Sequence, residues 1–407
     1  MRRALLILLA LSSLLPVEAA QADLAGSLTR QMSQAGSFSG AYVLNLTTGE
    51  REFAWRAGTP RILASNTKLF TSAAALARFG TDGTLATRVL GAGELDAEGI
   101  WRGSLYLRGG GDPTFGSRSF TSKFYGSGAT VEDLAALIDE AGVERVTGRI
   151  FGDESSHDSL RGGPDSGYGV SIWVGPLSAL SFNRGLATES GRSYQTSPPA
   201  FAAARLDAAL EARGIRVRLK PRAGETPVGT TELAAVESPP METLVRLTNK
   251  ASDNFFAEIL VKDLAMQARG VGTTSAGARL AAGFARRLGA PARLADGSGL
   301  SRANRASPRR VVRLLGAMSE RDEFDAWYAS LPVAGRDGTL RDRMRRGAAR
   351  GRCRGKTGTL SNVSALSGYC TARSGELYAF SILMNSVYTP GARLLQDRMA
   401  QAIAAQR

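Results

Sequence analysis

Apolar and polar positions follow two different patterns along the 407 residues of this chain. Towards both ends, stretches with the helical spacing of apolar residues stand beside short alternating runs that are typical of strands. Expected helices cover residues 23–34, 64–79, 241–251, 254–268, 307–319 and 392–405, and expected strands cover 38–46, 50–55, 352–359, 363–371 and 376–384. Helices and antiparallel strands from both ends predict an α+β domain that is discontinuous in sequence.

The middle of the chain has a different texture. Short β-like runs such as Ser104–Leu107 alternate with glycine-rich turns such as Gly109–Pro113, and one helix is expected over residues 130–141. This pattern predicts an inserted region rich in strands. The expected division is a main domain of residues 23–80 and 238–407, with an insertion of residues 81–237.

The N-terminus predicts a secretory signal peptide over residues 1–22. Arg2 and Arg3 form a basic region, the run Ala4–Leu15 is apolar but too short for a transmembrane helix, and Ala20–Ala22 offers small residues for cleavage. A cut three residues earlier and a buried N-terminal helix are the alternatives. No later segment reaches the length of a transmembrane helix, so we expect a soluble exported protein, with the periplasm as its compartment.

The net charge is +14 at pH 7. A basic exported protein is attracted to anionic surfaces such as cell-wall polymers and lipid headgroups, so at most peripheral membrane or wall association is expected. The densest basic stretch, residues 341–354, contains seven arginines. Export argues against nucleic acid as a partner, and we interpret this stretch as a solvated basic face.

The chain has two cysteines, Cys353 and Cys370. If they face each other in an antiparallel hairpin, the turn is centred between Ser361 and Asn362, which lie between two strand-like runs. Directly opposite residues in such a pair bring their Cβ atoms close enough for a disulfide, and an exported protein meets oxidising conditions. We predict a cross-strand disulfide; the alternative is two reduced thiols packed as small apolar groups.

His157 is the only histidine, which limits the possible chemistry. A zinc site with several histidines is excluded, and the cysteine and histidine spacings match no zinc pattern. A Ser-His-Asp triad would have to use His157, and no serine stands in a G-x-S-x-G motif. We interpret His157 as an ordinary polar residue.

Lysine is the alternative base for a serine nucleophile. Ser65 and Lys68, three residues apart at the start of an expected helix, place both side chains on one face. The free N–H groups of a helix start also favour negative charge beside the serine. Lys68 can accept a proton only if its pKa falls from about 10.4 towards neutrality. Alone this S-x-x-K pattern is weak, since an N-cap serine with an exposed lysine has the same spacing.

Two further motifs strengthen this hypothesis. Ser252-Asp253-Asn254 is expected at a turn between two helices, and Lys356-Thr357-Gly358-Thr359 lies on an expected strand. The order S-x-x-K, S-D-N, K-T-G is that of penicillin-binding proteins and class A β-lactamases. The chain resembles the D-alanyl-D-alanine carboxypeptidase/endopeptidases of class C, among the low-molecular-mass penicillin-binding proteins. The resemblance extends over nearly the whole mature chain and includes residues 65–68, 110–113, 177–183, 249–254, 296–302, 334–340 and 356–360.

The resemblance implies a transpeptidase-like domain of the penicillin-binding/β-lactamase type, with an antiparallel sheet flanked by helices. It implies that Ser65 attacks the carbonyl of the penultimate D-alanine of a cell-wall stem peptide and forms an acyl-enzyme. Lys68 would be the base, Ser252 would relay the proton to the leaving group, and Asn254 would hold Lys68 and the substrate amide.

The same resemblance assigns the third motif to substrate binding. Lys356 would keep the site electropositive and, with Thr357, receive the terminal carboxylate. The backbone N–H groups of Ser65 and Thr359 would form the oxyanion hole. β-Lactams are expected to acylate Ser65 as covalent inhibitors, and neither a metal nor an organic cofactor is implied.

Two other functions remain open from the sequence. A class A-like β-lactamase shares all three motifs but hydrolyses its acyl-enzyme rapidly with an extra glutamate, which the sequence does not identify. The long insertion between Lys68 and Ser252 favours the peptidase. The third possibility is a catalytically silent wall-binding homologue, against which the intact set of motifs argues.

Overall fold

The computed structural model describes residues 15–191 and 193–407. Most of the expected signal peptide, residues 1–14, lies outside the described residues. The first helix, α1 (Leu15–Ser33), extends the helix expected from residue 23 towards the N-terminus. No helix in the described part of the chain is long and apolar enough to cross a membrane.

An antiparallel sheet unites the two ends of the chain. Its order is β10-β11-β12-β1-β2, so the first and last thirds of the sequence meet between β1 and β12. The strands are β1 (Ser39–Asn45), β2 (Arg51–Trp55), β10 (Cys353–Leu360), β11 (Val363–Thr371) and β12 (Leu377–Asn385), and a separate small pair is β3 (Arg61–Ile62) with β9 (Arg305–Ala306). The sheet and its helices confirm the predicted α+β fold.

The hairpin of β10 and β11 has the predicted register. Leu360 pairs with Val363 around the turn, and Cys353 pairs with Cys370 at the other end. The two cysteines form a disulfide, as predicted from the spacing. Alternation of inward and outward residues along both strands is therefore set by the turn and by the covalent bond together.

Removal of this disulfide is expected to destabilise the protein without altering its site. The Cys353→Ala/Cys370→Ala variant should lose about 3 kcal/mol of unfolding free energy, because the bond closes a loop of 17 residues in the unfolded chain. Urea unfolding followed by circular dichroism measures the change. Reduction should shift the wild-type midpoint by the same amount and leave the variant unaffected; an unchanged midpoint in the variant would contradict the expectation.

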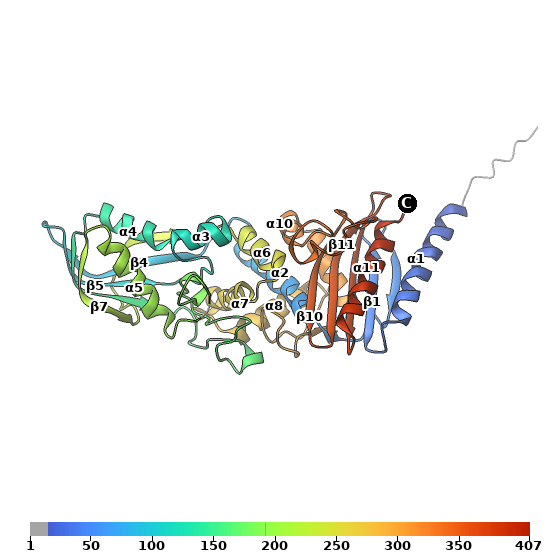
Figure 1. Ribbon diagram of the computed structural model, residues 1–407, viewed down its shortest axis with the longest axis horizontal. Coiled ribbons are helices and arrows are strands. Elements are labelled where there is room, and N and C mark those ends of the chain that lie inside the picture. The colour runs from blue at the N-terminus through green and yellow to red at the C-terminus, as the bar shows by residue number, and fades with distance from the viewer. Residues whose placement is uncertain (1–14, 192) are drawn as a thin grey trace, which may run out of the picture.

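Helices cover both faces of this sheet. α1 and α11 (Thr389–Ala404) pack together at the right of the view in Figure 1, and α9 (Pro308–Ser319) packs on the other face of the sheet. Beyond α9 lies a helical layer of α2 (Thr67–Phe79), α6 (Met241–Lys250), α7 (Asn254–Arg269), α8 (Thr274–Arg287) and α10 (Phe324–Ser330). α8 and α10 were not predicted from the sequence pattern.

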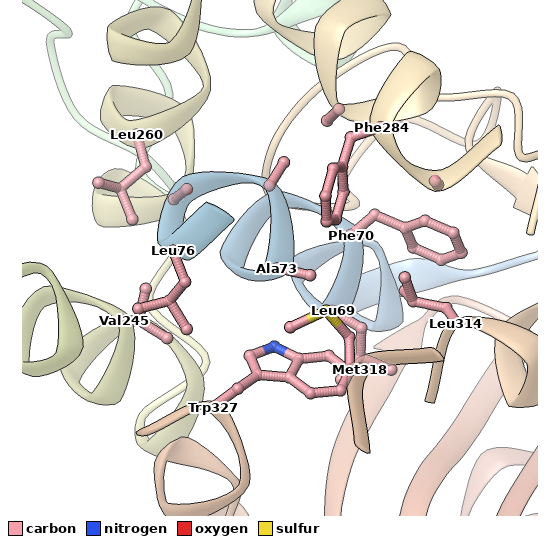
Figure 2. Packing of buried hydrophobic residues seen from close by; sticks show 14 of the residues in the cluster. Leu69, Phe70, Ala73, Leu76, Val245, Leu260, Phe284, Leu314, Met318 and Trp327 are labelled. Carbon is pink, nitrogen blue, oxygen red and sulfur yellow. The ribbon is translucent and has the colours of Figure 1, made fainter. Parts of the chain in front are cut away.

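The helix α2 lies at the centre of the helical layer. Its side chains Leu69, Phe70 and Leu76 are fully buried and point in several directions into the core (Figure 2). Ten consecutive residues of α2 are buried, so other elements surround this part of the helix, and neighbouring helices supply Trp327 and Phe284 to this core. This packing fixes the helix whose first turn carries Lys68.

The insertion forms a second five-stranded sheet of order β7-β6-β5-β4-β8. Its strands are β4 (Ala86–Leu95), β5 (Ile100–Arg108), β6 (Arg145–Asp153), β7 (Arg216–Ala223) and β8 (Thr231–Glu237), and its helices are α3 (Arg118–Tyr125), α4 (Val131–Glu140) and α5 (Pro198–Glu211). The helix expected over residues 130–141 is confirmed as α4, whereas α3 and α5 were not predicted. α5 begins with two prolines and continues in alanines, a good helix signal that the surrounding glycine-rich turns obscured. This sheet lies at the end of the molecule opposite the first sheet (Figure 1).

Candidate active site

The predicted nucleophile, Ser65, lies in a 3-10 turn (Ala64–Asn66) immediately before α2. Lys68 follows in the first turn of α2, and its Nζ is 3.2 Å from Ser65 Oγ. Ala64 has a φ of 47°, a left-handed conformation that is unfavourable for a residue with a side chain. Such backbone strain concentrates at functional sites, where the surrounding fold enforces it.

The Lys68 amine is held by two oxygen atoms that can only accept hydrogen bonds. Nζ donates to Asn254 Oδ1 at 2.7 Å and to the backbone carbonyl of Ser298 at 2.6 Å. A neutral amine has two N–H groups and one lone pair. If both N–H groups point at these acceptors, the lone pair faces Ser65 Oγ and can accept the hydroxyl proton.

Burial favours this neutral form of Lys68. The side chain is fully buried, and loss of solvation lowers its pKa to about 8. The carboxylates of Asp253, Asp296 and Glu258 raise the pKa and partly oppose the effect of burial. About a tenth of Lys68 is therefore unprotonated at pH 7, far more than for an ordinary lysine, and this neutral form can act as a general base.

The predicted S-D-N segment forms the turn between α6 and α7. Asp253 is the N-cap of α7 and accepts from the Phe256 N–H at 3.0 Å, which places Asn254 at the first helical position. Ser252 has a left-handed φ of 58°. Within the described part of the chain its hydroxyl makes no hydrogen bond, and it lines the cleft beside Asn254.

The predicted K-T-G segment lies on β10, an edge strand. Lys356 is fully buried, and its Nζ donates to the carbonyl of Thr357 at 3.0 Å. Burial lowers the pKa of Lys356 well below its usual value, and the charge of Lys68 lowers it further. Asn66, next to the nucleophile, donates to the Lys356 carbonyl at 2.9 Å and so connects the two motifs.

The free edge of β10 faces the nucleophile. The Gly355 N–H donates away from β11 to the carbonyl of Pro332, and alternate residues of a strand point to the same edge, so the Thr359 N–H points there too. A Cβ atom on Gly358 would lie 3.1 Å from the Ser65 nitrogen. Glycine at this position therefore lets the strand approach the Ser65 backbone closely.

These segments surround one cleft of about 800 Å³. It is lined by Ser65, Trp173, Ser252, Asn254, Leu300, Thr339, Asp342, Arg343, Thr357, Thr359, Leu360, Ser361 and Arg393. The structure thus brings five of the seven predicted site residues to the surface of the cleft. The other two, Lys68 and Lys356, are buried beside it.

Sequence reasoning missed the residues that support Lys68. The buried Glu258 accepts through Oε1 from the backbone N–H groups of Gly297 and Ser298, at 3.2 and 2.8 Å. It therefore holds Ser298, whose carbonyl accepts the hydrogen bond from Lys68 Nζ. Burial, together with the charge of the neighbouring Asp296, raises the pKa of Glu258 to about 7. The segment 296–302 was part of the resemblance, but nothing in the sequence marked Glu258.

The insertion also reaches the cleft. The carbonyl of Trp173 accepts from Asn254 Nδ2 at 3.1 Å. Arg184 forms a salt bridge with Asp253 at 2.6 Å, and its guanidinium lies over the ring of Phe255. The S-D-N turn is therefore fixed from the insertion as well as from its own helices.

His157 lies outside the cleft. It is buried beside α7, where its Nε2 is 2.8 Å from Asp263 Oδ1. Burial lowers the pKa of His157 well below its usual value, and the nearby Lys262 lowers it further. His157 forms a buried polar contact between the insertion and α7, away from the residues that line the cleft.

Comparison with known proteins identifies the family. The model of the D-Ala-D-Ala carboxypeptidase 3 (S13) family matches residues 20–196 and 184–406. The chain belongs to this family. It is accordingly a serine-type peptidase, and the predicted family is confirmed.

Relatives with known names agree. The chain of this S13 peptidase is 31% identical to a D-alanyl-D-alanine carboxypeptidase of Actinomadura sp., a comparison covering 91% of this chain and 81% of the relative. It is 30% identical to the carboxypeptidase DacB of Mycolicibacterium smegmatis, covering 89% of this chain and 79% of the relative.

Solved structures share the fold. Penicillin-binding protein 4 of Haemophilus influenzae matches with a TM-score of 0.77 at 20% identity, covering 91% of this chain and 97% of that chain. A predatory peptidoglycan endopeptidase of Bdellovibrio bacteriovorus, Bd3459, matches with a TM-score of 0.56 at 16% identity, covering 89% and 92%. The S13 chain thus has the penicillin-binding fold that the resemblance implied.

Proposed function

We propose that this protein is a serine-type D-Ala-D-Ala carboxypeptidase and endopeptidase that acts on peptidoglycan stem peptides through an acyl-enzyme at Ser65. One observation carries the proposal: the buried Lys68 amine is 3.2 Å from Ser65 Oγ, while its two shorter contacts are to acceptor oxygens. The lone pair of neutral Lys68 takes the Ser65 proton as Oγ attacks the penultimate D-alanine carbonyl. The released group is D-alanine or, at a crosslink, the neighbouring stem.

The remaining site residues take complementary roles in the proposed reaction. Ser252 lines the cleft with a free hydroxyl and relays the proton to the leaving nitrogen. Asn254 holds Lys68 through Oδ1. The backbone N–H groups of Ser65 and Thr359 stabilise the oxyanion, because preorganised donors act strongly on charge that develops in the transition state.

The terminal carboxylate of the substrate binds at β10. Thr357 donates to Thr339 Oγ1 at 2.7 Å, so both hydroxyls lie together at the cleft surface above the buried Lys356. An arriving carboxylate favours the ammonium form of Lys356 and offsets its burial. Water then hydrolyses the acyl-enzyme and releases the shortened peptide.

β-Lactams are the proposed covalent inhibitors, since they mimic the D-Ala-D-Ala end. The fold neighbours include penicillin-binding protein 4 complexed with a β-lactam and penicillin G-acylated Bd3459. We also propose export to the periplasm, where peptidoglycan lies, with at most peripheral association with membrane or wall. No resident metal or organic cofactor takes part in the proposed reaction.

Two assays with purified protein test the proposal. Intact mass spectrometry after exposure to penicillin should show a lasting adduct on the peptide that contains Ser65, and a soluble pentapeptide ending in D-Ala-D-Ala should release D-alanine. Rapid turnover of penicillin without a lasting adduct would instead indicate a β-lactamase. Absence of both an adduct and D-alanine release would indicate a silent wall-binding homologue.

The rate of acylation is expected to rise with pH up to about 8. Only neutral Lys68 can accept the proton, and with a pKa of about 8 its neutral fraction grows roughly tenfold per pH unit below that value. Pre-steady-state acylation by a labelled penicillin should show this slope between roughly pH 5.5 and 7.5, a range below the Lys68 pKa. The penicillin carboxylate stays ionised over this range, so its own charge does not change. A flat profile over that range would contradict Lys68 as the base.

A further inference from the structure

Among the described residues, the helices that pack on the second sheet leave one of its faces open. α4 and α5 pack against its inner face, where Val146, Ile150 and Leu105 are buried in one core. Residues that alternate with these along the strands point to the opposite side. We call this opposite side the open sheet face and define it by Tyr106, Arg145, Arg149, Phe151, Arg216 and Arg222.

An aromatic pair forms the middle of the open sheet face. The rings of Tyr106 and Phe151, on neighbouring strands, stack with their centroids 4.9 Å apart. The guanidinium of Arg149 lies 5.7 Å from the Phe151 ring centroid. This cation–π contact and a hydrogen bond from Arg149 Nη1 to the Lys220 carbonyl at 3.4 Å fix the position of the Arg149 side chain, and its other N–H groups are available to a ligand.

The charges on this face repel one another. The strand register places Arg145 directly opposite Arg216, and like charges in such pairs destabilise a sheet. Arg222 lies opposite Phe151, next to Arg149. Among the residues that the structure describes, none of these four arginines forms a salt bridge.

Protection of an edge strand explains only part of this arrangement. β7 is an edge strand, and charged side chains on an edge prevent pairing with another chain. Acidic residues would serve that purpose equally well and would relieve the repulsion, and Arg145 and Arg149 are on β6, an interior strand. A polyanion that bridges the four guanidinium groups would offset their repulsion, because arginine binds carboxylates in bidentate geometry.

We propose that the open sheet face binds peptidoglycan by its stem-peptide carboxylates, on a stem other than the one in the cleft. This inference rests on the proposed function, in that uncrosslinked stems carry a free carboxylate at their D-alanine end. The sheet lies at the far end of the molecule from the first sheet, and the helical layer lies between them (Figure 1). The cleft is lined by Asn254 of this layer and by Thr357 of β10. A second point of attachment raises the effective concentration of neighbouring stems at the cleft.

Cosedimentation with purified sacculi tests the proposal, using the Ser65→Ala background so that sacculi are not cut. Arg145→Glu/Arg216→Glu/Arg222→Glu keeps the edge strand charged but reverses the sign of the charge on the open sheet face. A matched control, Arg279→Glu/Arg286→Glu/Arg310→Glu, makes the same change in net charge at exposed positions on α8 and α9. We expect at least tenfold weaker binding for the first variant and less than a twofold change for the control. Equal losses in both, or no loss in the first, would overturn the proposal.

Three further measurements distinguish wall binding by this face from misfolding, loss of catalysis and membrane attachment. Arg145→Gln/Arg216→Gln/Arg222→Gln should also lose binding, and it replaces the glutamate variant if that one fails to fold.

With Ser65 restored, the variants that replace the three arginines should release D-alanine from soluble pentapeptide at the wild-type rate but digest sacculi more slowly. Inactivity of the wild type on soluble pentapeptide would refute the proposed function while the sedimentation result stands. Loss of binding to anionic lipid vesicles with unchanged binding to sacculi would assign the face to membranes and overturn the proposal.

Discussion

Replacement of Lys68 by alanine is expected to slow acylation of Ser65 by about 10²- to 10⁴-fold, the usual contribution of a positioned general base. The amine that accepts the hydroxyl proton is removed, while Ser65 and its backbone donors remain. Pre-steady-state labelling with a fluorescent penicillin measures the rate. The acylation rate of the variant should be nearly the same at every pH below 8. The rise of the rate with pH comes from deprotonation of Lys68, and the variant lacks this amine.

A double-mutant comparison separates catalysis from misfolding. Ser65→Ala should abolish the adduct, and Ser65→Ala/Lys68→Ala should hydrolyse pentapeptide no more slowly than Ser65→Ala alone, because residues that act as one unit are not additive. Thermal unfolding should show all three variants folded. An acylation rate of Lys68→Ala within about threefold of the wild-type rate would refute the proposed role of Lys68, because loss of a general base costs far more than threefold.

Local patterns predicted the elements that carry the chemistry. The S-x-x-K, S-D-N and K-T-G segments were placed on a helix start, an inter-helix turn and a strand, and the structure puts all three there. The disulfide and the register of β10 with β11 also followed from spacing alone, since a tight turn fixes every pair along a hairpin. The catalytic roles of Ser65, Lys68 and their neighbours stay predictions until the variants are measured.

Contacts between distant segments could not be predicted in the same way. Glu258 is one turn beyond Asn254 on α7, and its spacing is equally suited to an exposed helix position. Its importance comes from the loop at Ser298, forty residues away, whose backbone it holds. Likewise nothing near Trp173 marks it as the partner of Asn254, because a backbone carbonyl can come from any residue.

Replacement of Lys356 by methionine is expected to lower kcat/KM for D-alanine release by about 10- to 150-fold. This range corresponds to the loss of one charge-assisted hydrogen bond to a carboxylate, worth about 1.5–3 kcal/mol. Methionine has a similar length and suits the buried position, so the unfolding free energy should stay the same or rise, since burying the Lys356 amine with one hydrogen bond, to the Thr357 carbonyl, is itself costly. A fall in both activity and stability would indicate a structural role.

The substrate provides the matched control for Lys356. A pentapeptide whose terminal carboxylate is converted to an amide cannot pair with the ammonium group, so wild type and Lys356→Met should process it at similar, low rates. The variant's deficit should therefore appear only with the free acid. If Lys356→Met is slower than wild type by the same factor on the amide and on the free acid, Lys356 does not bind the terminal carboxylate. Its positive charge would then act on Lys68 or on the oxyanion instead.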